Sequence, residues 1–312
     1  MQNFIVTVNV ILPSFIMIGL GYLLKHLKLF DDHTLKSMNN ITFKTFLPLL
    51  LFYNVYKTNL KEGFNPKLMI FATLSIIISF FIAWIIISRL EKDKRKKGVL
   101  VQGIFRSNFV LFGMPISISL FGEELAGVPS MLIAVIVPIF NFLSVIILEI
   151  YRGENIDLKK ILKGIITNPL ICASIFGLFM TAIGVKLPSV VDKTIFDITK
   201  VATPLALIIL GGSFEFKTIS NSKKQLVGAI IGRLIIIPGI FIPIGIMLGF
   251  RNIELATLIV MFAAPTAISS FTMAQQMEAD SELAGNIVVF SSTFAILTMF
   301  IWIFIVKQMG FI

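Results

Sequence analysis

Apolar residues fill the chain in long blocks, and charged residues gather in the short stretches between them. Each block is roughly 18 to 24 residues long, which is the length that a helix needs to cross about 30 Å of hydrocarbon. The pattern therefore predicts an all-α polytopic membrane protein with ten transmembrane helices. Their expected positions are 4–24, 38–56, 68–88, 98–121, 128–150, 169–185, 190–212, 225–249, 254–276 and 283–306.

Composition excludes a water-soluble domain, because 56% of the 312 residues are hydrophobic and only 14% are charged. The net charge of +10 does not indicate nucleic acid, since the basic residues lie in the loops, most densely at 89–97. The lone Cys172 can form no intramolecular disulfide. The first block has no basic region before it and no small-residue cleavage motif after it, so it predicts an uncleaved first helix.

The distribution of basic residues predicts how the chain is oriented in the membrane. Ten helices place the loops after odd-numbered helices on one face and both termini on the other. Sixteen lysines and arginines lie in the first set of loops, and seven lie on the opposite side. Because positive residues favour the cytoplasmic side, we expect both termini to lie outside the cytoplasm. The expected location is a bacterial-type inner membrane, crossed many times, with the lipid bilayer as a partner.

The two halves of the chain resemble each other, which indicates an internal repeat. Matched residues are 156 positions apart in the first pairs and 150 apart in the last: Pro13 with Pro169, Lys44 with Lys200, Pro48 with Pro204, and Pro115 with Pro265. Five helices per half is an odd number, so the halves enter the membrane in opposite directions. We expect a 5+5 inverted repeat of 1–152 and 169–312, joined by a short cytoplasmic linker at 153–168.

The fourth and ninth blocks each carry a proline near polar residues, and both helices are expected to be broken there. The fourth contains Asn108, Gly113 and Pro115. Proline removes a backbone donor, and glycine permits unwound dihedral angles. In the ninth block, Pro265 is followed by hydroxyl side chains at Thr266, Ser269 and Ser270. A half-helix that restarts after a break presents free N–H groups, which can bind an anion. The alternative to two broken helices is a pair of ordinary proline kinks.

Three stretches resemble the auxin efflux carrier family, which includes plant auxin exporters and bacterial carriers of malonate and malate. They are NFVLFGMP at 108–115, FKTFLPLLLF at 43–52 and APTAISSFTMAQQ at 264–276. The resemblance implies the fold of bile-acid and sodium/proton carriers. In that fold helices 1, 2, 6 and 7 form a scaffold, a candidate surface for a homodimer. Helices 3–5 and 8–10 form a moving transport domain, in which the fourth and ninth helices cross. The linker at 153–168 is short, whereas long plant exporters carry a large cytoplasmic segment there.

Charged and polar residues inside the apolar blocks are the candidate site. Arg106 lies near the expected break, and its guanidinium can give two parallel hydrogen bonds to a substrate carboxylate. The alternative is that Arg106 reaches the cytoplasmic interface or pairs with an acid in a loop. Asn141 is either a substrate contact or a bridge between helices. The substrate-binding candidates are Arg106, Asn108, Gly113, Pro115, Asn141, Pro265, Thr266, Ser269 and Ser270.

The other charges inside the blocks carry no clear functional assignment. Asp197 lies three residues before Lys200 and is most simply its partner on one helical face, and the alternative is a role as proton acceptor. Lys44 is expected to extend to the lipid headgroups. The sequence gives Arg233 no role.

These features predict a secondary active transporter of a small organic anion, working by elevator-type alternating access. A mono- or dicarboxylate and an auxin-like weak acid all fit the candidate site. The alternatives are an organic-anion channel and a membrane-embedded sensor of the same fold. The coupling ion, Na⁺ or H⁺, stays open. No metal-ligand spacing, nucleophile triad or cofactor motif is present, so neither enzyme activity nor a cofactor is expected.

The predicted orientation can be checked with a cysteine at position 37, in a chain whose Cys172 is replaced by serine. Ser37 lies near the first cytoplasmic loop, so Ser37→Cys should resist an impermeant thiol reagent in intact cells and react after permeabilisation. Equal labelling before and after permeabilisation would show that the predicted orientation is wrong.

Overall fold

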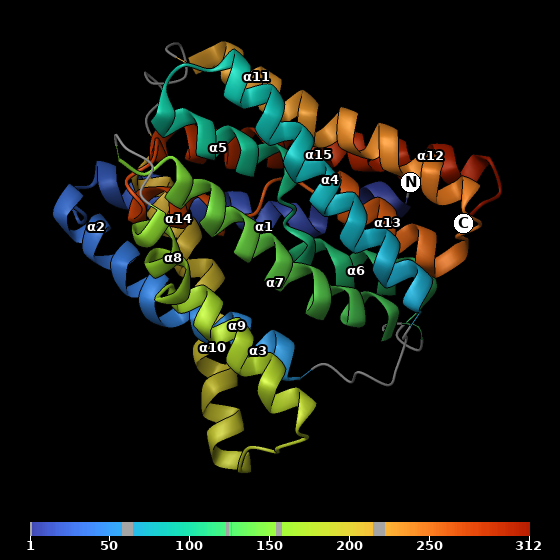
Figure 1. The fold of residues 1–312 in the computed structure, drawn as a ribbon, viewed down its shortest axis with the longest axis horizontal. Helices are drawn as coiled ribbons and strands as arrows, with labels where there is room; N and C mark the ends of the chain where they lie inside the picture. Colours follow the sequence, from blue (N-terminus) through green and yellow to red (C-terminus); the bar gives the residue numbers. More distant parts are fainter. Residues whose placement is uncertain (1, 58–64, 123–124, 126, 154–157, 215–221) are drawn as a thin grey trace.

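The computed structural model describes residues 2–57, 65–122, 125, 127–153, 158–214 and 222–312. Within these residues all of the regular secondary structure is helical (Figure 1). The first half contains α1 (Gln2–His26), α2 (Asp32–Ile41), the π-helix η1 (Thr42–Phe46), α3 (Leu47–Tyr56), α4 (Pro66–Leu90), α5 (Lys94–Phe105), α6 (Phe109–Phe121) and α7 (Gly127–Ile150). The second half contains α8 (Leu158–Ile166), α9 (Pro169–Ala182), α10 (Ser189–Gly212), α11 (Lys223–Ile231), the π-helix η4 (Gly232–Ile236), α12 (Ile237–Met247), α13 (Asn252–Ala263), α14 (Ser269–Gln276) and α15 (Ser281–Gln308).

Each predicted apolar block is helical, and the fourth and ninth blocks are each divided into two helices, α5 with α6 and α13 with α14. Within the described residues, five helical stretches are long and apolar enough to cross a membrane: α4, α7, α10, the stretch Lys223–Met247 and α15. α6, α9 and α13 are shorter apolar helices. The chain is therefore an all-helical, polytopic membrane protein, as its hydrophobic pattern predicts.

The helices pack in two groups that meet along one interface. In the first group α1 packs on α10, and α3 packs on both α9 and α10. The second group contains α4–α7 and α11–α15, in which α13 packs on α6 and α14 on α15. Figure 1 shows α3, α9 and α10 together at one corner of the molecule, away from α11 and α12. The groups touch where α1 meets α6 and α15, α3 meets α7, and α10 meets α14.

Glycines set the close approach of α1 to α10. An added Cβ on Gly21 would lie 2.0 Å from the carbonyl oxygen of Ile208, and one on Gly211 would lie 1.9 Å from that of Ile18. Both distances are far inside van der Waals contact, and the obstacle is backbone that cannot rotate away. Membrane helices gain packing energy from such small-residue contacts, because lipid provides no hydrophobic drive for them to associate.

The expected break at Pro115 is wrong, because α6 begins at Phe109 and continues through Pro115. The fourth block is instead interrupted at 106–108, where neither proline nor glycine occurs. A proline costs a helix one hydrogen bond, which a well-packed membrane helix tolerates. Gly113 likewise does not unwind the chain: an added Cβ there would lie 2.7 Å from the ring of Phe109, so the glycine makes room for that ring.

Gly21→Val should separate α1 from α10 and lower stability by at least about 1–3 kcal/mol, the usual cost of overpacking. Gly19 is the matched control, because an added Cβ at that position of α1 meets nothing within 4 Å. Thermal unfolding in detergent should show a lower Tm for Gly21→Val and an unchanged Tm for Gly19→Val. Equal Tm values for the two variants would contradict the close α1–α10 contact.

Candidate functional site

The interruptions of the fourth and ninth blocks lie side by side and share a backbone hydrogen bond. Ser107 and Thr266 form an isolated antiparallel bridge, and the N–H of Asn108 donates to the carbonyl of Pro265 at 2.8 Å. The N–H of Thr266 donates to Oγ of Ser291 at 3.1 Å. Unwound backbone at membrane depth persists only where protein supplies such partners. The two extended segments therefore form one joint, from which four half-helices diverge.

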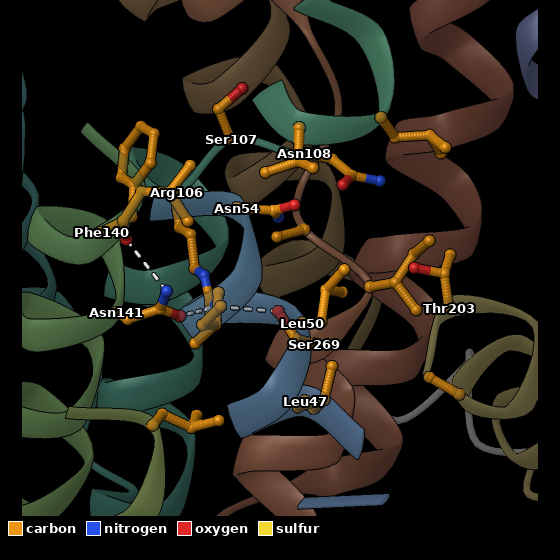
Figure 2. Close-up of a pocket in the computed structure, with 18 of the residues that line it drawn as sticks. Leu47, Leu50, Asn54, Arg106, Ser107, Asn108, Phe140, Asn141, Thr203 and Ser269 are labelled. Carbon is orange, nitrogen blue, oxygen red and sulfur yellow. Dashed lines mark hydrogen bonds between the residues drawn. The ribbon is translucent and has the colours of Figure 1, made fainter. Parts of the chain in front are cut away.

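A cavity of about 330 Å³ lies beside this joint, between the two helix groups (Figure 2). α3, α9 and α10 form one wall, and the 106–108 segment, α6, α7 and the start of α14 form the other. Seven of the lining residues are polar or charged: Asn54, Arg106, Ser107, Asn108, Asn141, Thr203 and Ser269. The others are apolar: Leu47, Leu50, Leu51, Val110, Leu111, Pro115, Val137, Phe140, Leu170, Ala206, Ala267 and Ile268.

Arg106 is buried and supplies the charge in this cavity. One terminal nitrogen of its guanidinium donates to Oδ1 of Asn141 at 2.5 Å and to Oγ of Ser269 at 2.7 Å. The other donates to Oε1 of Gln102 at 3.3 Å and contacts the sulfur of Met273. Figure 2 shows the side chain lying between Asn141 and Ser269. Among the described residues Arg106 has no carboxylate partner, and its Nε atom has no hydrogen-bond partner at all.

Two half-helix N-termini add to the positive character of this region. α6 begins directly after Asn108, and α14 begins at Ser269, and both residues line the cavity. The first N–H groups of a helix lack partners within the helix and carry a partial positive charge of about half an elementary charge. The cavity therefore combines a buried cation with two positive helix ends, an arrangement that attracts an anion.

The predicted residues divide into a group at the cavity and a group beside it. Arg106, Asn108, Pro115, Asn141 and Ser269 line the cavity, whereas Gly113, Pro265, Thr266 and Ser270 do not.

Three of the residues that do not line the cavity, Pro265, Thr266 and Ser270, hold the joint together. Pro265 accepts from Asn108, Thr266 donates from Oγ1 to the carbonyl of Gly103 at 2.8 Å, and the carbonyl of Ser270 accepts from Gln102 at 3.1 Å.

Sequence reasoning missed three polar lining residues, Asn54, Ser107 and Thr203. Ser107 is buried, and its hydroxyl has no hydrogen-bond partner. Its position between Arg106 and Asn108 was a usable signal, since three consecutive polar residues are rare inside an apolar helix. Asn54 and Thr203 lie on α3 and α10, in stretches that give no hint of a shared cavity.

The remaining charges inside the apolar blocks lie away from the cavity lining and are paired, exposed or bonded to backbone. The Lys200 amine lies 2.8 Å from Asp197, and both side chains are more than half exposed, which confirms the predicted ion pair. Lys44 is exposed on η1. Arg233 is buried and donates to backbone carbonyls. No cluster of three or more metal-ligating His, Cys, Asp or Glu side chains occurs among the described residues.

Comparison with known proteins identifies the class of the chain. Residues 6–303 match a family described as "Membrane transport protein". An uncharacterized transporter of Methanocaldococcus jannaschii is 23% identical over 308 residues, covering 95% of this chain and 98% of the relative. The uncharacterized transporter YfdV of Escherichia coli K12 is 20% identical, covering 95% and 96%. Auxin efflux carrier component 8 of Arabidopsis thaliana is 20% identical over 359 residues, covering 96% of each. The predicted resemblance to the auxin efflux carrier family is thereby confirmed, and these names point to transporters rather than enzymes.

Proposed function

Because the chain belongs to the membrane transport protein family, we propose that it is a secondary carrier of a small organic anion, working by elevator-type alternating access. One observation supports this most directly. Arg106 is buried at the edge of a cavity, close to two half-helix N-termini, and its hydrogen-bond partners among the described residues are neutral.

Electrostatics explains why an anion is the expected ligand. A charged side chain at the centre of a membrane helix costs about 2.5–3.5 kcal/mol on insertion scales. Neutral oxygens from Gln102, Asn141 and Ser269 offset part of this cost but leave the net charge in place. A carboxylate that replaced the oxygen of Asn141 or Ser269 beside the guanidinium would cancel the charge and accept charge-assisted hydrogen bonds. The site is therefore built to gain most from a ligand that carries negative charge.

The lining favours one carboxylate on an apolar body. Beyond Arg106 the cavity is mostly aliphatic, and its far wall offers neutral Asn54 and Thr203. A second carboxylate would have no cation to pair with there, and desolvating an unpaired charge is costly. A volume near 330 Å³ also suits a compact molecule. We infer a monocarboxylate with an aliphatic or aromatic body rather than a dicarboxylate.

Alternating access would come from movement of the two helix groups against each other. α1–α3, α9 and α10 would form the scaffold, and α4–α7 with α11–α15 would carry the joint and most of the site. The cavity lies at the interface between the groups, where sliding changes which side of the membrane the cavity faces. In this proposal the chain crosses an inner membrane ten times as a 5+5 inverted repeat, with both termini outside the cytoplasm. Either Na⁺ or H⁺ would drive it.

Arg106→Gln should weaken carboxylate binding by about 10–150-fold, the loss expected for a charge-assisted hydrogen bond of about 1.5–3 kcal/mol. Arg106→Lys should recover only part of the affinity, because lysine lacks the planar fork. The measurement is binding of labelled butyrate, benzoate, indole-3-acetate and malonate to purified protein. Lys200→Gln, which removes an exposed cation, is the control and should bind as wild type. Unchanged affinity in Arg106→Gln would remove Arg106 from the site.

A crosslink between the helix groups should stop transport and spare binding. Leu210 of α10 and Gly285 of α15 suit this test, because an added Cβ on Gly285 would lie 3.0 Å from the Leu210 side chain. The matched control joins α5 to α15 within the proposed moving group, through Gly103 and Ile287, whose corresponding distance is 3.1 Å.

Both cysteine pairs would be introduced without Cys172 and assayed in proteoliposomes, oxidised and then reduced. The α10–α15 crosslink should abolish uptake reversibly, and the α5–α15 crosslink should leave uptake intact. Full uptake under complete α10–α15 crosslinking would contradict the elevator mechanism, and single-channel currents would then test a channel.

A further inference from the structure

Arg233 is the second buried arginine, and its partners differ from those of Arg106. Its side chain lies in η4 and is 1% exposed. Its Nε donates to the carbonyl of Ala264 at 2.7 Å, and its terminal nitrogens donate to the carbonyls of Met261 at 2.8 Å and Phe105 at 3.1 Å. All three bonds go to backbone oxygen, and they reach both sides of the joint.

These carbonyls belong to the ends of two half-helices. Phe105 is the last residue of α5, Met261 lies in the last turn of α13, and Ala264 directly follows α13. The last four carbonyls of a helix have no partner within the helix, and each helix end carries about half a negative charge. Two such ends together balance about one positive charge. Arg233 can therefore stay charged and buried without an acid, whereas the positive helix ends near Arg106 leave that arginine uncompensated.

Local structure around Arg233 directs it toward the joint. Gly232, at the start of η4, lets the helix approach α5 closely, since an added Cβ there would lie 3.1 Å from the side chain of Ile104. Pro238 cannot donate to the carbonyl of Leu234 four residues earlier, and Nε1 of Trp302 donates to it instead at 3.1 Å. Short π-helical segments such as η4 are frequent at functional sites.

We propose that Arg233 is a positioning residue for the anion site: it joins the ends of α5 and α13 and balances their charge. The half-helix ends that point the other way, with Arg106 between them, then keep the net positive charge that binds the ligand. Arg233 does not line the cavity and acts through the backbone that carries Arg106. The link to ligand affinity rests on the proposed function, but the link to the geometry of the joint does not.

Hydrogen–deuterium exchange of the protein in nanodiscs measures the joint directly. Arg233→Met retains an unbranched side chain that packs like the aliphatic part of arginine, and it leaves three buried carbonyls without their donor. Amides of Asn108 and Thr266, whose hydrogen bonds hold the two segments, should exchange roughly 5–150-fold faster, the range expected when a buried group loses its partner. Arg233→Lys retains the charge without the fork and should give a smaller increase at the same two places.

Arg251→Met is the matched control, because Arg251 also donates to backbone carbonyls, those of Ile246 and Phe250, but at an exposed turn. It should leave exchange at 105–108 and 264–266 unchanged. Wild-type exchange there in Arg233→Met, or faster exchange confined to η4 and α12, would overturn the proposal. Should Arg233→Met fail to fold, Arg233→Lys decides, and wild-type exchange in that variant overturns the proposal equally.

Benzoate binding to the same variants tests the connection to the site. Affinity should fall in Arg233→Met together with faster exchange, and unchanged affinity despite faster exchange would overturn the positioning role. If wild-type protein binds none of the carboxylate probes, the proposed ligand class has failed. In that case the exchange measurement still tests whether Arg233 holds the joint together.

Discussion

The structure depends on satisfying the hydrogen bonds of backbone that is unwound inside apolar surroundings. Each of the two interrupted blocks frees N–H and C=O groups at a depth where no bulk water can pair with them. Here the N–H of Asn108 bonds to Pro265, the N–H of Thr266 bonds to Ser291, and carbonyls on both sides bond to Arg233. Every one of these partners comes from another element. The interruptions therefore fix how α5, α6, α13 and α14 pack, and also where η4 and α15 must lie.

Charge follows from the same geometry. Four half-helices meet at the joint, two through their negative C-terminal ends and two through their positive N-terminal ends. The negative ends of α5 and α13 are met by Arg233 through three carbonyls, while the positive ends of α6 and α14 lie at the cavity beside Arg106. Two arginines at similar burial thus have opposite electrostatic situations. Arg233 neutralises the helix ends around it, and Arg106 adds to the positive region at the cavity.

Sequence reasoning recovered what depends on residues near one another in the chain. The apolar blocks gave the helices, the Asp197–Lys200 spacing gave an ion pair, and Pro265 marked a true interruption. Pro115 misled, because a single lost hydrogen bond does not break a helix that neighbours support. The 106–108 interruption depends on a partner segment about 160 residues away, which local pattern cannot reveal. The partners of Arg233 could not be predicted from the sequence for the same reason. They are backbone carbonyls, which every residue carries, so no residue type marks them.

The charge of Arg106 also links loading to movement in the proposed carrier. When the moving group slides past the scaffold, Arg106 must pass an aliphatic wall that includes Leu47, Leu50 and Ala206. An empty site would present an uncompensated positive charge to that wall, and low-dielectric surroundings make such a charge expensive. A bound carboxylate forms an ion pair with no net charge, so the loaded group meets a lower barrier. The guanidinium that recognises the anion would then also favour movement of the loaded carrier over the empty one, with no separate gate needed to distinguish the two states.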